Sequence, residues 1–166
     1  MMFSTKAEYG VRVMAHLAAC DGERPVPLGT IADAEGLPLA YLEHLAQRLR
    51  KAELVVSTRG ARGGYVLARP AGEISMAEVV TALEGAIAPI DCITAGEDGE
   101  LACNHETAGV PCPTKLLWTR VQGSIVKTLT EMTLEDLTSN QPKAAGSRQP
   151  KQNAGQDAPR REISAV

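Results

Sequence analysis

The sequence predicts a mainly α-helical protein with a small β-hairpin wing: a winged helix-turn-helix followed by a long C-terminal dimerisation helix. Three observations lead to this prediction. Three amphipathic helical segments come first. Two short β-branched runs then flank the glycine-rich stretch RGARGG, which is typical of a hairpin turn. A last helical segment carries a narrow apolar stripe that needs a partner.

Residues 5–20 are expected to form the first helix, because Val13, Leu17 and Cys20 recur at intervals of three to four residues. Thr5 and Glu8 have the spacing of a capping box, which marks a helix start. The turn formers of DGERPVP then predict a loop.

The next two helices form the predicted helix-turn-helix. LGTIADAEG indicates a short helix that Gly36 ends. LPLAYLEHLAQRLRKAELV indicates the third helix, which carries Leu42, Leu45 and Leu49 on one face. Basic residues cluster near its C-terminal end, where cations suit the helix dipole.

Leu54–Thr58 and Tyr65–Ala68 are the predicted strands of the wing. Its turn places Arg59 and Arg62 at the tip, where glycines allow a tight turn and a close approach to phosphates. An arginine at such a tip can enter a narrow A·T-rich minor groove. An ordinary solvated turn is the alternative for RGARGG taken alone.

In a winged helix-turn-helix the third helix enters the major groove, and its N-terminal residues reach base edges. We therefore expect this protein to bind double-stranded operator DNA. Glu43 could accept a hydrogen bond from cytosine, repel phosphates, or be a solvated carboxylate. Tyr41 could bond a phosphate oxygen or pack under the wing. The candidate DNA-binding residues are Leu39, Ala40, Tyr41, Glu43, His44, Arg48, Arg59 and Arg62.

The C-terminal half begins with a fourth predicted helix, Ser75–Leu83, and a polar loop. Thr114–Met132 then predicts a long helix, and the short TLEDL turn follows. A second copy of the chain is the economical partner for its apolar stripe, which indicates a homodimer. That stripe consists of Trp118, Val121, Ile125, Leu129 and Met132.

We divide the chain into four parts: a DNA-binding domain, a connecting helix with the polar loop, a dimerisation helix and a tail. The tail is rich in Pro, Gly, Gln, Ala and charge, a composition typical of disorder. The expected boundaries are 1–70, 71–112, 113–140 and 141–166.

Charge is unevenly distributed along the chain, whose net charge is −3. Residues 1–70 carry nine Lys and Arg against seven Asp and Glu, residues 71–140 three against eleven, and residues 141–166 five against two. DNA should therefore meet the first part or the tail. The sequence shows neither an apolar signal-peptide region nor a run of roughly 20 apolar residues. We expect a cytoplasmic protein without membrane contact.

Three of the four cysteines lie in the polar stretch DCITAGEDGELACNHETAGVPCPT. Clustered cysteines without an export signal favour metal or redox chemistry over disulfides. Wide spacing with no short CxxC pair suits an iron–sulfur cluster, and structural zinc stays open as the alternative. These candidate ligands are Cys92, Cys103 and Cys112, whereas Cys20 is expected to be buried in the first helix.

The stretch YLEHLAQRLRKAELVVSTRGARGGYVL resembles the Rrf2 family of bacterial winged-helix regulators, and the similarity runs from about Ser4 to Leu137. The resemblance implies a homodimer that binds a partly palindromic operator. It also implies that Arg59 enters the minor groove and that the stretch from Leu39 to His44 contacts the major groove.

The resemblance further implies that the three loop cysteines hold an iron–sulfur cluster. Members of the IscR type add a histidine three residues after the last cysteine, but Lys115 stands there, and a protonated lysine cannot ligate. Similarity to NsrR-like members makes Glu8, supplied across the dimer, the first choice for the fourth ligand. His105 is the second. Glu106, Asp91, solvent or a small thiol would be further choices.

We favour a 2Fe–2S over a 4Fe–4S cluster, because the CPTKLLW context resembles IscR- and SufR-like regulators. The expected function is a transcriptional repressor that senses cluster, iron or redox status. A regulator that responds to nitric oxide or thiol oxidation and a zinc-stabilised interaction module are the alternatives. An enzyme is not expected, since the sequence has no CxxC, no nucleotide-binding glycine motif after a strand and no acid–base pair near the cysteines.

Overall fold

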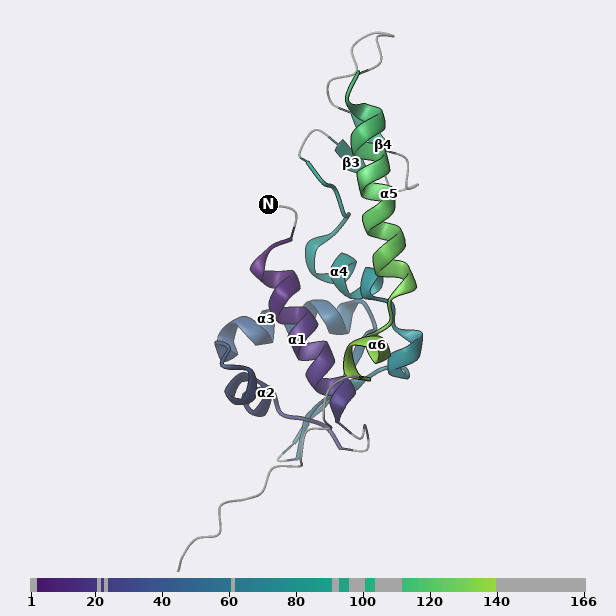
Figure 1. The fold of residues 1–166 in the computed structure, drawn as a ribbon. Helices are drawn as coiled ribbons and strands as arrows, with labels where there is room; N and C mark the ends of the chain where they lie inside the picture. The colour runs from purple at the N-terminus through teal and green to yellow at the C-terminus, as the bar shows by residue number, and fades with distance from the viewer. Residues whose placement is uncertain are drawn as a thin grey trace, which may run out of the picture.

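A computed structural model describes residues 3–20, 22, 24–60, 62–90, 93–95, 101–103 and 112–139. Figure 1 shows a helical body from which one long helix projects. In chain order the elements are α1 (Thr5–Ala19), α2 (Leu28–Glu35), α3 (Leu39–Lys51), β1 (Val55–Thr58), β2 (Gly64–Leu67), the 3₁₀ turn η1 (Ala71–Glu73), α4 (Met76–Glu84), β3 (Ile93–Ala95), β4 (Leu101–Cys103), α5 (Lys115–Glu131) and α6 (Leu134–Thr138).

This order confirms the predicted fold, which is mainly helical with an antiparallel two-stranded wing. Gly36 ends α2 in the left-handed conformation, with a φ of 65°, as expected of a helix-ending glycine. The wing pairs Val55 with Leu67 at its base and Thr58 with Gly64 near its tip. The tail from residue 141 lies outside the described residues.

The core forms where α1, α3 and α4 pack on one another (Figure 1). Its fully buried side chains are almost all aliphatic, as the low aromatic content of 3% requires. The largest of them include Met14, Ile31, Leu42, Leu45, Leu49, Leu54, Ile74, Leu83 and Leu134. Helices α2 and α3 are therefore held by a shared apolar core, which sets the direction in which α3 presents its outer face.

The start of α1 differs from the capping box expected of Thr5 and Glu8. Ser4 is the N-cap, and its hydroxyl accepts from the backbone N–H of Lys6. The backbone N–H groups of Ser4 and Ala7 donate to Oε1 of Glu84 at 2.9 and 3.2 Å. Glu84 ends α4, so a carboxylate distant in sequence fills the role expected of Glu8.

The C-terminal part leaves the helical body along α5 and then returns to it. Backbone bonds join Met76 to Met132 and Leu134 to Ile74, each at 2.9 Å. Leu134 of α6 is fully buried in the core. The C-terminal end of α5 is therefore fixed to the start of α4. Figure 1 shows the N-terminal half of α5 beside β3 and β4, away from the wing.

We predict that Glu84→Ala lowers the free energy of unfolding by about 1–3 kcal/mol, because it leaves the N–H group of Ser4 without its acceptor and removes one of the two acceptors of the Ala7 N–H group. Only 15% of the Glu84 side chain is exposed. Chemical denaturation measures the effect. Glu131→Ala is the matched control, since Glu131 is exposed and pairs with Lys127 on the helix surface. Equal stability of both variants would contradict this role.

The same contacts predict a pH dependence. Burial raises the pKa of Glu84, but hydrogen bonds from Ser4 and Ala7 and the charge of Lys6 outweigh it, so the pKa lies below its usual 4.5. A lowered carboxyl pKa stabilises the fold fully above the unfolded-state pKa and less as the pH falls through the folded-state pKa. Denaturation below pH 4.5 should therefore show a smaller gap between wild type and Glu84→Ala than at pH 7.

Candidate DNA-binding surface and cysteine hairpin

The outer face of α3 lies opposite its buried stripe of Leu42, Leu45, Ala46 and Leu49. Helical spacing of three and four residues places five exposed side chains on this outer face. They are Ala40, Glu43, His44, Gln47 and Lys51. Three of these were predicted from the sequence. Gln47 and Lys51 were not among the predicted DNA contacts, although helical spacing from His44 places both on this face.

Tyr41 is half-buried and packs against α1. Its ring meets that of Tyr9 edge to face, with centroids 5.7 Å apart and planes at 87°. Such aromatic pairs stabilise by about 0.5–1.5 kcal/mol beyond the area that they bury. Tyr41 therefore links α3 to α1.

Arg48 lies toward α4 and away from the outer face of α3. Its Nη1 donates to the carbonyl oxygen of Leu83 at 3.1 Å. Arg50 and Lys51 are exposed at the C-terminal end of the same helix. The structure thus gives Arg48 a contact within the fold, in addition to the DNA contact that the sequence predicts for it.

The wing is held against the loop between α1 and α2. Val26 and Tyr65 exchange two backbone hydrogen bonds, both of 2.9 Å. Gly64 lies so close to the backbone of Val26 that a Cβ atom there would overlap it. Gly60 has a φ of 114°, in the region that favours glycine. Arg59 and Arg62 are both exposed at the tip.

The cysteine stretch contains a second hairpin that the sequence did not predict. Strands β3 and β4 pair antiparallel, with Ile93 opposite Cys103. Ile93 directly follows Cys92 in the sequence. Figure 1 shows this hairpin beside α5, and β3 contacts that helix. Each strand has three residues, which is too short for an alternating pattern to stand out.

Cys112 is half-buried directly before α5. Its Sγ lies 3.3 Å from Oγ1 of Thr114, and its carbonyl oxygen accepts from the N–H of Lys115, at 3.1 Å. Lys115 is the first residue of α5. Cys112 therefore lies next to the N-terminal end of α5, which is the positive end of the helix dipole.

The other predicted ligands are described only in part. Cys92, His105, Glu106 and Asp91 lie outside the described residues, as does the side chain of Cys103. Among the side chains that are described, no three His, Cys, Asp or Glu groups come together as a metal site. Glu8 is described: 58% of its side chain is exposed on α1, and it pairs with Arg12 at 3.1 Å.

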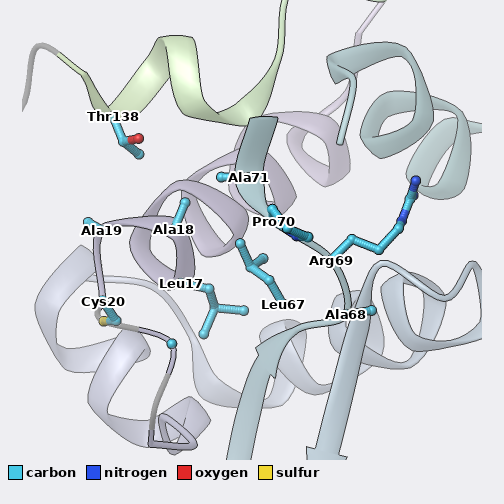
Figure 2. Close-up of a pocket in the computed structure, with 11 residues that line it drawn as sticks. Leu17, Ala18, Ala19, Cys20, Leu67, Ala68, Arg69, Pro70, Ala71 and Thr138 are labelled. Atoms are coloured by element: carbon cyan, nitrogen blue, oxygen red, sulfur yellow. The ribbon is translucent and has the colours of Figure 1, made fainter. Parts of the chain in front are cut away.

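Cys20, which was expected to be buried, is the half-buried C-cap of α1. It lies at the rim of a pocket of about 600 Å³ between the end of α1 and the end of β2. Figure 2 shows the side chains around this pocket, with Leu17 and Leu67 inside and Arg69 at one end. Cys20 thus belongs to the helical body and not to the β3–β4 hairpin.

Helix α5 carries apolar side chains that the chain itself does not cover. Leu116, Leu117 and Val126 are 64%, 56% and 36% exposed. Most of the predicted stripe is half-buried, and Leu129 packs on the core. Gln122 is buried and donates to the carbonyl oxygen of Ile87 at 2.9 Å, which fixes α5 to the segment after α4.

In the described part, no helix has the length and hydropathy that a bilayer crossing requires.

Three helices, a wing with an arginine at its tip and an exposed outer face on the third helix define a winged helix-turn-helix DNA-binding protein. The sequence model of the Rrf2 family, described as an iron-dependent transcriptional regulator, matches residues 3–140. This chain belongs to the Rrf2 family and is a transcriptional regulator, not an enzyme.

Relatives in this family include two named types of regulator. IscR of Sodalis glossinidius is 37% identical over 85% of this chain and 81% of its own length. CymR of Bacillus subtilis is 39% identical over 84% of this chain and 91% of its own. The chain is thus similar to regulators of both the IscR and the CymR type.

Solved structures give the same result. The structure of CymR, described as the global cysteine regulator of B. subtilis, has a TM-score of 0.69 and 36% identity, covering 86% of this chain and 99% of that one. The structure of T. potens IscR has a TM-score of 0.68 and 36% identity, covering 90% and 94%. Both support the winged helix-turn-helix fold.

The packing of Gly64 yields a prediction for the wing. Gly64→Ala should lower the free energy of unfolding by about 1–3 kcal/mol, since the added Cβ must displace the backbone of Val26. DNA affinity should fall with it as the hairpin moves. Thermal unfolding and DNA titration measure both effects.

Gly29→Ala is the control, because a Cβ at Gly29 meets no atom within 4 Å. It lies within α2, where Ala is favoured over Gly, so stability should stay equal or rise. A Gly64→Ala variant as stable as Gly29→Ala would show that the wing tolerates this displacement.

Proposed function

We propose that this chain is a homodimeric repressor that binds operator DNA and senses iron–sulfur cluster status through Cys92, Cys103 and Cys112. The observation that carries the proposal is the β3–β4 hairpin beside α5, which joins the cysteine stretch to the uncovered helix. We divide the chain functionally at the boundaries given above, with the DNA-binding domain first and the cysteine loop before the dimerisation helix.

The strand pairing supports a common role for Cys92 and Cys103. Ile93 is opposite Cys103. Consecutive Cα atoms are about 3.8 Å apart, and facing Cα atoms of an antiparallel pair are about 4.5–5.5 Å apart. The backbone of Cys103 therefore lies beside that of Ile93, which follows Cys92 in the sequence, and this supports a common role for the two cysteines. A structural zinc site would more often use a short CxxC pair, which this stretch lacks.

The surroundings of Cys112 support its role as the third ligand. A thiolate is the form that ligates iron, and the N-terminus of α5 favours that charge. Lys115 begins α5 at the place where IscR-type members carry a histidine, so the fourth ligand must come from another part of the chain or of its dimer. Three thiolates and one oxygen or nitrogen donor fit an iron–sulfur cluster, and we favour the 2Fe–2S type.

Glu8 is the first choice for that fourth ligand. Its carboxylate is not used to cap α1, because Glu84 satisfies the N–H groups of Ser4 and Ala7. It faces solvent with an i,i+4 ion pair to Arg12, and exposed pairs of this kind are worth about 0.3–0.5 kcal/mol. Giving up this ion pair so that Glu8 can ligate a cluster held by a second copy would therefore cost little free energy. His105 remains the alternative.

The uncovered side chains of α5 support the homodimer. Leu116 and Leu117 lie in the first turn of the helix, beside the cysteine stretch, and Val126 lies further along it. Burying such side chains against a second copy stabilises by about 25 cal/mol per Å² of apolar surface. A cluster ligated from both copies would tie cluster state to the relative position of the two DNA-reading heads.

DNA recognition is assigned to two surfaces. The outer face of α3 would enter the major groove, with Glu43, His44 and Gln47 at base edges and Lys51 near phosphates. Arg59 and Arg62 at the wing tip would follow the backbone or enter the minor groove. Leu39, Ala40 and Tyr41 belong to the first turn of α3, and Arg48 could reach DNA only by giving up its bond to Leu83.

We predict that single Cys→Ser changes at Cys92, Cys103 and Cys112 remove cluster absorbance from anaerobically purified protein, because each removes one thiolate ligand. Iron and sulfide assays with a visible spectrum measure the loss. Cys20→Ser is the matched control and should retain the cluster, since Cys20 lies in the helical body. A colourless, iron-free wild type would refute the proposal. One zinc per chain without sulfide would replace it with a zinc-stabilised module.

We predict that Glu8→Ala weakens cluster retention under oxygen or chelator by about tenfold or more, as loss of a metal ligand or its support does. Decay of the visible bands measures it. Glu131→Ala, an exposed helix carboxylate, is the control. If His105→Ala shows the loss and Glu8→Ala does not, the fourth ligand is His105.

One comparison favours a second candidate, a regulator that responds through thiol chemistry. Similarity to CymR, described as a global cysteine regulator, is as high as similarity to IscR. Addition of nitric oxide or an oxidant with stopped-flow detection separates the possibilities. Only cluster chemistry changes the visible iron–sulfur bands, whereas thiol oxidation would alter DNA affinity in iron-free protein.

A further inference from the structure

The outer face of α3 changes its chemistry along the helix. Its C-terminal end is basic, with exposed Arg50 and Lys51, and its middle is polar, with Glu43, His44 and Gln47. Its first turn is apolar: Leu39 is 44% exposed, and Pro38 and Ala40 are exposed as well. The end of the helix expected to reach base edges thus offers few hydrogen-bonding side chains.

An open depression surrounds Ala40 at this end of α3. It is lined by Thr5, Tyr9, Pro38, Ala40, Tyr41 and His44. Its lining includes the edge-to-face pair of Tyr9 and Tyr41, so both rings are fixed by one another. Most of the surface here is aromatic, aliphatic or methyl, and Thr5 and His44 contribute polar atoms.

This depression is poorly suited to a phosphate group. Two helix starts border it. At α1 the N–H groups already donate to the carboxylate of Glu84 and the hydroxyl of Ser4. At α3 the N-cap Pro38 has no N–H, and the N–H of Tyr41 donates to the carbonyl oxygen of Pro38. No lysine or arginine is among the residues that line the depression. An apolar group of the DNA is therefore the better match.

We propose that this depression receives the 5-methyl group of a thymine in each operator half-site, with Ala40 as the specificity-determining contact. The major groove displays donors and acceptors and one apolar group, the thymine methyl, and Ala side chains are among those that contact it. Seating the methyl against Ala40 leaves Glu43 and Gln47 free to hydrogen-bond with neighbouring bases. The inference rests on the proposed insertion of α3 into the major groove.

The occupant follows from the charge pattern around the depression. Lys51 lies on the same face as Ala40, eleven residues further along α3, which corresponds to about 16 Å of helix. A cation at that distance matches a phosphate of a duplex whose base edge rests at Ala40. A protein partner would offer no reason for this combination of an apolar start, a polar middle and a basic end.

The test uses a duplex that the wild-type full-length chain selects from a random-sequence pool. Each thymine is replaced in turn by deoxyuridine, which lacks only the 5-methyl group, and affinity is measured by fluorescence anisotropy. One replacement per half-site should weaken wild-type binding about fourfold, which is the worth of one buried methyl. Ala40→Gly should bind the unmodified duplex more weakly and show no further loss with deoxyuridine.

Ala34→Gly is the matched control, because Ala34 is exposed within α2 and the change carries the same helix penalty. It should keep the fourfold deoxyuridine effect. The inference fails if no thymine is sensitive, or if the loss is as large with Ala40→Gly as with wild type.

Gln47→Ala and Lys51→Ala separate this inference from the proposal beneath it. If both weaken binding while no thymine is methyl-sensitive, α3 reads the groove and only the role of Ala40 is wrong. If neither changes affinity, α3 is not the groove-reading helix, and the proposed DNA surface fails together with the inference.

Discussion

The carboxylate of Glu84 is the interaction on which the arrangement of this protein depends. It accepts from Ser4 and Ala7 and so closes the start of α1 from the end of α4. The two helices pack closely here, because Gly10 has no Cβ and lies directly against the side chain of Leu83. The segment that leads to the β3–β4 hairpin begins after Glu84, so its first residues are held close to the start of α1.

Those first turns connect several functional parts. Tyr9 contacts Tyr41 on α3, the helix proposed to read DNA, while Glu8 is exposed on the helix surface one residue before Tyr9. A displacement of α4 or of Glu8 would therefore be passed to α3 through a short and rigid piece of helix. Packed elements of this kind shift as units, which is what coupling between two sites requires.

The sequence was sufficient for most of the fold, because local signals agree with the tertiary structure. Gly36 ends α2 where a left-handed residue is needed, and the β-branched runs around RGARGG form the wing. The capping of α1 could not be found this way, since its carboxylate acceptor lies 80 residues from Ser4. The β3–β4 hairpin was missed because three-residue strands carry no readable period.

The candidate site was predicted less evenly. Exposure of Glu43 and His44 follows from helical periodicity alone, but the partner of Tyr41 and the bond from Arg48 to Leu83 depend on which helices meet. Pairing of Ile93 with Cys103 likewise depends on how the loop folds back. Ligand spacing along a chain says little about such contacts, because loops of different length can bring the same atoms together.

The short distance from Cys112 to Lys115 fixes the angular position of α5 relative to the sulfur. An α-helix turns by about 100° per residue. One residue added or removed between them would rotate Leu116 and Leu117 by that angle around the helix axis, away from any surface that they share with a second copy. Changes in length between Cys112 and Lys115 should therefore be selected against among related chains.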